Sequence, residues 1–269
     1  MPYCSVIDTR IYYETEGTGD PMVLIHGAGQ DTLSWRFAVP YLSKHYKTIA
    51  IDLPGHGKSV IAPQGPITCI EDYARFLNAF VDEMKLAPAT LVGHSMSGNT
   101  VLQASLNRPD QIKAAVPLDG AGMTLMEAVS YSDEILELVT VNTVDYWETN
   151  FQALCSPQTD EGRKKLIAAE TKRVPAEVIL GDLQAYTSFD ISEKVGKITV
   201  PVALITGEED WSCKAENVRT TEKMLTCPKV LAVLSGVGHF PHMEAPEMFS
   251  GTVFRLLTAL REKRQGAKT

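Results

Sequence analysis

The sequence predicts an α/β protein built around a mostly parallel, twisted sheet with helices on both faces. Short apolar segments, which are typical of buried parallel strands, alternate along the chain with longer segments whose apolar residues recur at helical spacing. Ser95, Asp210 and His239 each follow closely on such a strand-like segment. Because ligands bind at the carboxyl ends of parallel strands, these three side chains are expected at one edge of the sheet.

The elements can be justified in order from the N-terminus. Segments 4–7 and 11–15, which flank a turn at Asp8 and Thr9, predict an opening antiparallel hairpin. The strands that follow are predicted at 22–25, 48–51, 89–92, 114–118, 202–206 and 230–234, and the helices between and after them at 35–42, 70–85, 99–107, 215–225 and 247–260. Strands and helices that alternate in this way predict a parallel sheet with crossover helices.

The alternation stops between Gly120 and about Ile198. No segment there has a convincing strand pattern. Helices are predicted instead at 134–141, 144–154, 160–173 and 176–186, the last beginning after Pro175. The sequence therefore predicts a helical insertion within the sheet-forming chain.

The run Gly93-His94-Ser95-Met96-Ser97-Gly98 lies between a predicted strand and a predicted helix. A serine at the crest of such a turn has an exposed hydroxyl, and the first N–H groups of the helix point toward it. This geometry suits a nucleophile and the oxyanion that forms when it attacks. Ser97 occupies the second glycine position of the usual pattern and is small enough to replace it. Taken alone, Ser95 could equally be a helix N-cap.

Four further motifs accompany this turn. They are His-Gly at 26–27, Asp-x-Pro-Gly-His-Gly-x-Ser at 52–59, Gly-x-x-Asp at 207–210, and Gly-His at 238–239 with Glu244-x-Pro246 behind it. On these motifs the chain resembles the α/β-hydrolase family from about residue 6 to residue 260. The resemblance implies an eight-stranded sheet with a helical cap after the sixth strand. It divides the chain into a core at 1–120 and 199–269 and a cap at 121–198.

The resemblance also implies the roles of individual residues. Ser95 corresponds to the nucleophile of a catalytic triad, His239 to the general base and Asp210 to the acid. A serine hydroxyl needs a base to take its proton, and the imidazole needs an anion on its far nitrogen. The backbone N–H groups of Ala28 and Met96 correspond to the oxyanion hole.

Other assignments of the acid and of the histidines stay open. Asp119 follows the predicted strand at 114–118, where some hydrolases of this fold place the acid. His94 is expected to pack structurally. His239 and His242 are spaced as a metal pair could be, but Pro241 interrupts the local helix and no further ligand lies at suitable spacing, so we expect no metal. No cofactor is expected either.

The predicted cap helices carry many apolar and aromatic residues. Met126, Trp147 and Phe151, together with Phe240 beside the base, are expected to bind the substrate. The alternative is that most of them pack among the cap helices.

Charge and composition limit the partners. The chain has 269 residues and a formal net charge of −8, which disfavours nucleic acid. No leader or membrane-length apolar run is apparent, and five scattered cysteines suit a reducing compartment. We expect a soluble cytoplasmic protein, monomeric or homodimeric, that acts on a small molecule.

The leading functional hypothesis is a serine hydrolase that cleaves a small or medium apolar carboxylic ester through an acyl-enzyme. A carbon–carbon bond hydrolase of aromatic ring-cleavage products, a lactonase and a perhydrolase use the same triad. A non-catalytic small-molecule receptor is a further alternative, which an intact triad disfavours. An epoxide hydrolase or a haloalkane dehalogenase would need aspartate at position 95.

Overall fold

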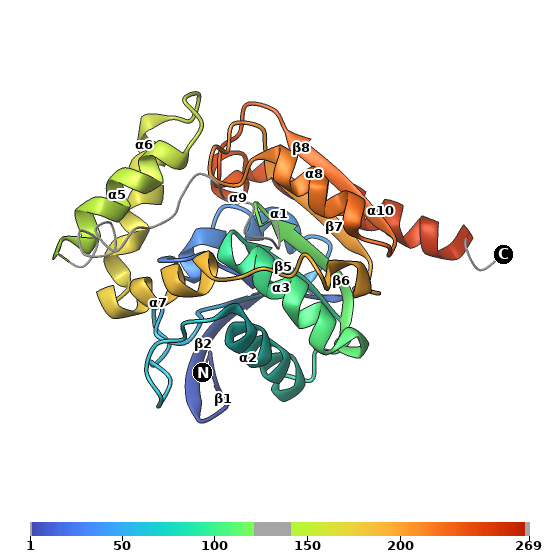
Figure 1. Ribbon diagram of the computed structural model, residues 1–269, viewed down its shortest axis with the longest axis horizontal. Coiled ribbons are helices and arrows are strands. Elements are labelled where there is room, and N and C mark those ends of the chain that lie inside the picture. Colours follow the sequence, from blue (N-terminus) through green and yellow to red (C-terminus); the bar gives the residue numbers. More distant parts are fainter. Residues whose placement is uncertain (1, 121–140, 267–269) are drawn as a thin grey trace.

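A computed structural model describes residues 2–120 and 141–266, and the side chains up to residue 263. Eight strands form one sheet in the order β1-β2-β4-β3-β5-β6-β7-β8 (Figure 1). The strands are β1 Tyr3–Val6, β2 Thr9–Glu16, β3 Pro21–Ile25, β4 Lys47–Ile51, β5 Ala89–His94, β6 Ile112–Leu118, β7 Val202–Gly207 and β8 Lys229–Leu234. Strand β2 pairs antiparallel with β1 and β4, whereas β3 to β8 run parallel. The predicted fold class is confirmed.

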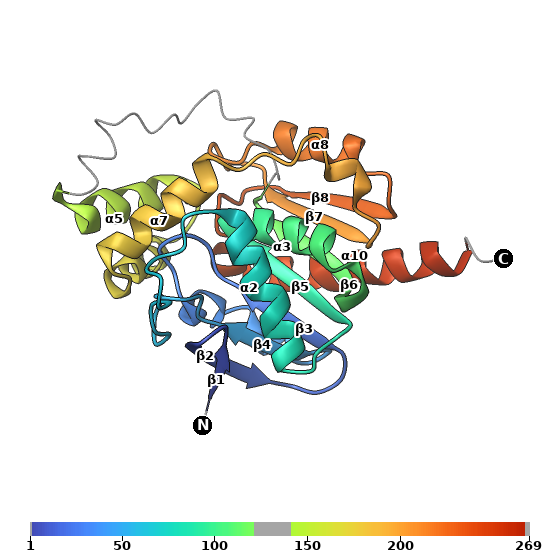
Figure 2. The same ribbon diagram turned by 60° about the horizontal axis from the view of Figure 1, so that its bottom comes forward.

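Alternate residues of each central strand face opposite sides of the sheet and enter two separate cores. In β3, for example, Val23 and Ile25 join one core, whereas Met22 and Leu24 join the other. The first core is covered by α2 Ile70–Glu83, α3 Met96–Asn107 and α8 Ala215–Met224, and the second by α1 Val39–Leu42 and α10 Pro246–Gly266. Figure 2 shows α2 and α3 side by side on their face.

Strand order places the candidate site. Strand β3 is flanked by β4 on one side and β5 on the other, so the chain leaves the centre of the sheet in two directions. In open parallel sheets the crevice at such a reversal, outside the carboxyl ends of the strands, is where ligands bind. The loop after β3 and the turn after β5 therefore meet at this crevice.

The described part of the segment between β6 and β7 contains helices joined by loops, and no strand. It contains α5 Thr143–Leu154, α6 Glu161–Ala168, α7 Ala176–Thr187 and two short 3-10 helices, η3 Ala169–Arg173 and η4 Val195–Lys197. We call residues 141–198 the helical insertion. Helices α5, α6 and α7 lie at the opposite end of the molecule from the C-terminus (Figures 1 and 2). The helix predicted at 134–141 falls mostly outside the described residues.

Two local predictions are wrong. The hairpin turn lies at Ile7 and Asp8, one residue earlier than predicted, because both adopt positive φ (46° and 57°). The helix predicted at 35–42 is broken into η1 Thr32–Trp35 and α1 Val39–Leu42. Asp31 caps the first piece by accepting a hydrogen bond from Leu33 N, which starts it three residues early.

None of the helices within residues 2–120 and 141–266 combines the length and the apolar character needed to cross a membrane.

Candidate active site

Ser95 occupies the turn between β5 and α3. Its backbone has φ 52° and ψ −119°, an uncommon conformation for a residue with a side chain, and it immediately precedes the first helical residue, Met96. Its N–H donates to the carbonyl of Leu118 at 2.7 Å, which ties the turn to the end of β6. The serine therefore sits at the amino end of α3, at the carboxyl edge of the sheet.

Close backbone approaches explain the small residues around this turn. A Cβ on Gly93 would lie 2.0 Å from the carbonyl oxygen of Ser97, and one on Gly98 would lie 2.8 Å from the Cα of Gly120. The second tight approach is thus at position 98, and position 97 has room for a side chain. The Ser97 hydroxyl uses that room to donate to the carbonyl of His26 at 2.5 Å.

The loop after β3 presents one backbone donor that is not engaged. The N–H of Gly27 donates to Gln30 Oε1 at 3.1 Å, and that of Gly29 donates to Asp182 Oδ2 at 2.9 Å. Between them, the N–H of Ala28 has no acceptor within the part of the chain that the structure describes. Ala28 also lines the same pocket as Ser95, so its N–H is available to a ligand.

His239 and Asp210 are joined by a short hydrogen bond, 2.6 Å from Nδ1 to Oδ2. The other oxygen of Asp210 accepts from the Ser212 N–H and hydroxyl, both at 2.8 Å, and from the Cys213 N–H at 3.0 Å. Burial alone would raise the pKa of Asp210, but the His239 ring and these donors outweigh it and lower the pKa. Asp210 is therefore a carboxylate held against the imidazole.

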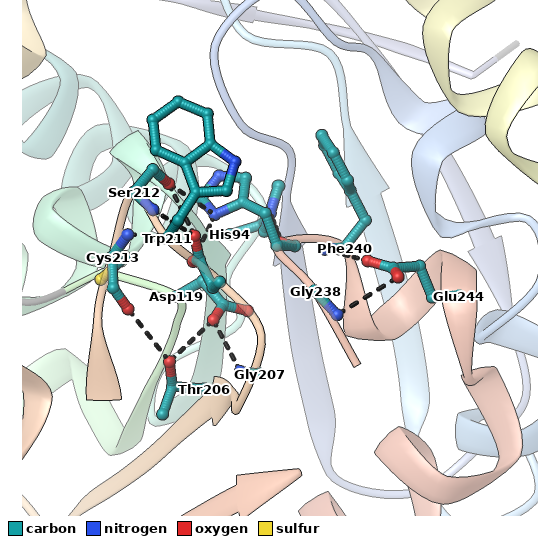
Figure 3. A network of polar contacts seen from close by, with 12 residues as sticks. His94, Asp119, Thr206, Gly207, Trp211, Ser212, Cys213, Gly238, Phe240 and Glu244 are labelled. Carbon is teal, nitrogen blue, oxygen red and sulfur yellow. Dashed lines mark hydrogen bonds and ion pairs between the residues drawn. The ribbon is translucent and has the colours of Figure 1, made fainter. Parts of the chain in front are cut away.

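Asp119, the alternative acid, lies nearby but makes different contacts (Figure 3). Its Oδ1 accepts from the Thr206 hydroxyl and from the Gly207 N–H, both at 2.9 Å. Burial, and then the negative charge of Asp210, raise the pKa of Asp119 well above its usual range. Asp119 therefore holds its proton more strongly than an ordinary aspartate does, beside the Asp210–His239 pair.

Asp119, Asp210 and His239 have possible metal-ligand atoms within 4.8 Å of one another. They are the only such group found in residues 2–120 and 141–263. The 2.6 Å bond between His239 and Asp210 leaves no room for an ion between them.

The loop that carries His239 is held by Glu244 (Figure 3). Its carboxylate accepts from the N–H of Phe240 at 2.9 Å and from that of Gly238 at 3.2 Å. It also accepts from Ser156 N at 2.8 Å, in the loop after α5. The motif residue Glu244 therefore anchors the His239 loop to the helical insertion.

The other histidines of the region are buried and structural. His94 Nε2 lies 2.8 Å from the carbonyl oxygen of His239, and its Nδ1 lies 2.9 Å from Gln30 Oε1. Burial, with His242 and His239 nearby, lowers the pKa of His94 well below its usual range. Burial lowers the pKa of His242 to about 3, and its ring stacks between those of Trp35 and His94. His242 does not pair with His239 as metal ligands would.

A pocket of about 550 Å³, partly open to solvent, is lined both by loops at the carboxyl edge of the sheet and by the helical insertion. Ser95 and His239 lie in its wall. The remaining lining residues are Ala28, Gln30, His94, Trp147, Asn150, Phe151, Leu154, Leu183, Tyr186, Trp211, Ser212 and Phe240. Most of this wall is apolar or aromatic.

The structure brings the expected residues together at one place. Trp147, Phe151 and Phe240 line the pocket, and Ala28 and Met96 flank Ser95. Met126 lies outside the described residues. Six further lining residues were not expected from the sequence, namely Gln30, Asn150, Leu154, Leu183, Trp211 and Ser212. Trp211 and Ser212 follow Asp210 directly, so their position beside the acid was the available signal.

The chain belongs to the α/β-hydrolase fold family, whose model matches residues 20–246, and it is a hydrolase. One relative, (E)-2-((N-methylformamido)methylene)succinate hydrolase of Acinetobacter baylyi, is 29% identical over 89% of this chain and 90% of its own. Another, 2-hydroxy-6-oxo-6-(2'-aminophenyl)hexa-2,4-dienoic acid hydrolase of Metapseudomonas resinovorans, is 28% identical over 94% of this chain and 88% of its own.

Among solved structures, a thermophilic esterase from Thermogutta terrifontis superposes with a TM-score of 0.86. It covers 97% of this chain and 99% of its own at 19% identity. At that identity the likeness shows the fold alone.

Proposed function

We propose that the protein is a serine hydrolase that cleaves small or medium apolar carboxylic esters through an acyl-enzyme intermediate. Ser95 Oγ attacks the ester carbonyl, and His239 takes the hydroxyl proton at Nε2, because its Nδ1 is engaged by Asp210. His239 then gives this proton to the departing alcohol. A water molecule then attacks the acyl group while the same imidazole takes one of its protons. His239 passes this proton to Ser95 Oγ as the acyl–oxygen bond breaks, which releases the carboxylic acid and restores the serine.

The oxyanion of each tetrahedral intermediate is bound by the N–H groups of Ala28 and Met96. Met96 is the first residue of α3, where N–H groups have no acceptor within the helix. The N–H of Ala28 is the one unengaged donor between those of Gly27 and Gly29. Backbone donors of this kind need no reorganisation when charge develops on the oxygen.

The observation that carries the ester assignment is that no Lys or Arg stands among the described residues lining the pocket. Residues 121–140 contain no Lys, Arg or His and four acidic residues, so that segment cannot supply a cation either. Burying a carboxylate without a partner is costly. The names of both relatives above denote carboxylate-bearing substrates. The pocket of this chain suits a neutral substrate better.

We also propose that residues 121–198 form a cap on a core of residues 1–120 and 199–269. The core supplies Ser95 and His239 to the pocket, whereas α5 and α7 supply Trp147, Phe151 and Leu183. On this division the core performs the chemistry and the cap selects the substrate.

The first test identifies the nucleophile. A fluorophosphonate probe should label the wild-type protein and should not label Ser95→Ala, whose esterase activity should fall by roughly 10⁶-fold, as in a comparable triad. Asp119→Asn serves as the control that keeps both labelling and activity. Equal labelling of wild type and Ser95→Ala would refute the assignment.

The second test separates the ester from the carbon–carbon alternative. Rates are compared for a p-nitrophenyl ester of monomethyl succinate, for the matching ester that carries a free carboxylate, and for a 2-hydroxy-6-oxo-dienoic acid. The neutral ester should be preferred over the anionic one by at least ~10-fold in kcat/KM, which corresponds to only about 1.4 kcal/mol. A preference for the anionic ester would contradict the inference of a neutral substrate, and a preference for the dienoic acid would contradict the ester assignment.

A further inference from the structure

The helical insertion holds the loop after β3 at three consecutive residues. The Gly29 N–H donates to Asp182 Oδ2 at 2.9 Å, and Gln30 Nε2 donates to Glu170 Oε2 at 3.2 Å. Arg173 Nε donates to Asp31 Oδ2 at 2.6 Å. Every one of these partners lies between η3 and the end of α7, about 140 residues or more further along the chain. This loop carries Ala28.

Asp182 differs from the other two partners because it binds the backbone of the loop and not a side chain. It lies on α7 and is fully buried. Its Oδ2 also meets His56 Nε2 at 2.9 Å, and its Oδ1 accepts from the Tyr73 hydroxyl at 2.6 Å. His56 Nδ1 faces the carbonyl of Pro54 at 3.1 Å, so both ring nitrogens of His56 point at acceptors. A protonated His56 therefore balances the buried charge of Asp182.

The contacts of the loop fix two successive peptide planes around Ala28. The Ala28 N–H belongs to the same planar peptide as the carbonyl of Gly27. That carbonyl accepts from His26 Nδ1 at 2.8 Å and from the Gln30 N–H at 3.3 Å. The next peptide, between Ala28 and Gly29, is held through the Gly29 N–H by Asp182 alone. Gly29 has φ +65° and no side chain to restrain it.

We propose that Asp182 is a positioning residue that orients the Ala28 N–H for the oxyanion, so that the helical insertion completes an oxyanion hole built on a core loop. This rests on the proposed serine hydrolase mechanism. Without the Asp182 carboxylate, Ala28 is held from one side only, through the Gly27 carbonyl, and the residue that carries the donor can shift away from the oxyanion. Misplacing a reacting group by about 1 Å can cost 10²-fold in rate.

Three variants test this. Asp182→Leu keeps the approximate shape but removes every acceptor, and Asp182→Asn keeps one acceptor without the charge. Tyr73→Phe is the matched control, because it removes another buried partner of the same carboxylate and leaves the bond to Gly29. Each variant is first checked for folding by circular dichroism and thermal unfolding.

The decisive readout is the ratio of kcat for an oxygen ester to kcat for its thionoester. The larger sulfur anion accepts hydrogen bonds poorly, so a well-aimed oxyanion hole favours the oxygen ester. We expect Asp182→Leu to lower kcat on the oxygen ester by about 10- to 100-fold with little change in KM, and to lower the ratio. The ratio for Asp182→Asn should lie between those of the wild type and Asp182→Leu, and Tyr73→Phe should leave the ratio unchanged.

An unchanged ratio in Asp182→Leu would overturn the proposal, as would an equal fall in Tyr73→Phe. If Asp182→Leu does not fold, the ratio in Asp182→Asn decides in the same way. Labelling of Ser95 by the fluorophosphonate probe distinguishes the two levels of failure. If Ser95 is labelled and the ratio in Asp182→Leu is unchanged, only the role of Asp182 is refuted. If Ser95 is not labelled in the wild type, the serine hydrolase mechanism itself is refuted.

Discussion

Two buried aspartates at the carboxyl edge of the sheet show how surroundings decide a residue's chemistry. Asp210 meets an imidazole and three hydrogen-bond donors, and its pKa is lowered. Asp119 meets a hydroxyl, one N–H and the negative charge of Asp210, and its pKa is raised. The surroundings therefore favour the charged form of the side chain at position 210 and the protonated form at position 119.

This contrast predicts unequal effects of replacing the two aspartates. We expect Asp210→Asn to lower kcat by roughly 10⁴-fold, because the imidazole then adopts the wrong tautomer. Asp119→Asn keeps the shape of the side chain and does not touch the partner of the imidazole, so it should cost far less. Steady-state kinetics of both variants at pH 7 measure the difference. A larger loss from Asp119→Asn would move the acid to the end of β6.

The residues of the proposed triad could be predicted from the sequence because each follows a strand and carries a local motif. Asp182 could not, because its partner Gly29 is 153 residues away. Its signal was only a charged residue beside the apolar positions Ile179 and Leu183 of a predicted helix. Such a pattern indicates that the charged residue has a hydrogen-bond partner, but it does not identify that partner.

At the scale of elements, α5 presents one face to the pocket. Trp147, Asn150, Phe151 and Leu154 all line it, and their spacing places them on one side of a helix. The aromatic rings of Trp147 and Phe151 meet edge to face with centroids 5.5 Å apart. We propose that this face is where the helical insertion contacts a substrate.

Trp147→Ala should therefore change substrate choice and leave the triad intact. We expect discrimination between short and long acyl chains to relax by about 10- to 200-fold, the range that an apolar pocket contact supplies. Rates on p-nitrophenyl esters of increasing chain length measure this effect. Burial of Trp147 predicts a stability loss of roughly 3–5 kcal/mol, so folding is verified first.

Tyr146→Ala is the matched control, because Tyr146 is the neighbouring aromatic residue of α5 and does not line the pocket beside Ser95. It should leave the chain-length profile unchanged. A folded Trp147→Ala with the wild-type profile would assign Trp147 to packing within the insertion. If Phe151→Ala also keeps the wild-type chain-length profile, α5 does not select the substrate.

Element boundaries were less predictable than element types. The early start of η1 depends on Asp31, whose Oδ1 accepts from the Leu33 N–H and whose carboxylate also accepts from Arg173 in the insertion. Apolar spacing alone cannot reveal a cap that is held from another part of the chain. The strands were predictable because a buried strand needs only a short apolar run between turns.

For the whole molecule, the contact between insertion and core contains a carboxyl group that makes stability depend on pH. Glu170 is fully buried. Its Oε1 lies 3.3 Å from Arg36 Nη1 and 3.8 Å from Arg173 Nη2. Burial raises the pKa of Glu170 from 4.5 to about 8. The unfolded chain releases this proton near pH 4.5, whereas the folded chain keeps it to about pH 8. Stability is therefore lost as pH rises through this window.

We expect the unfolding temperature of the wild type to fall between pH 5 and pH 8, and that of Glu170→Gln to fall less, since glutamine has no proton to lose. Thermal unfolding at four pH values measures both slopes. Glu161→Gln, at an exposed position of the same insertion, is the control and should keep the wild-type slope. Identical slopes for wild type and Glu170→Gln would show that Glu170 is ionised throughout.

The left-handed turn at Ser95 limits which nucleophiles this position can accept. A side chain branched at Cβ is strongly disfavoured at φ 52°. Threonine has the same hydroxyl chemistry, yet Ser95→Thr should lose activity because the turn cannot hold it, whereas Ser95→Cys should keep the turn and still be acylated. Activity and labelling of the two variants test this. The turn thus admits an unbranched nucleophile such as serine or cysteine, and a branched one would require a different turn.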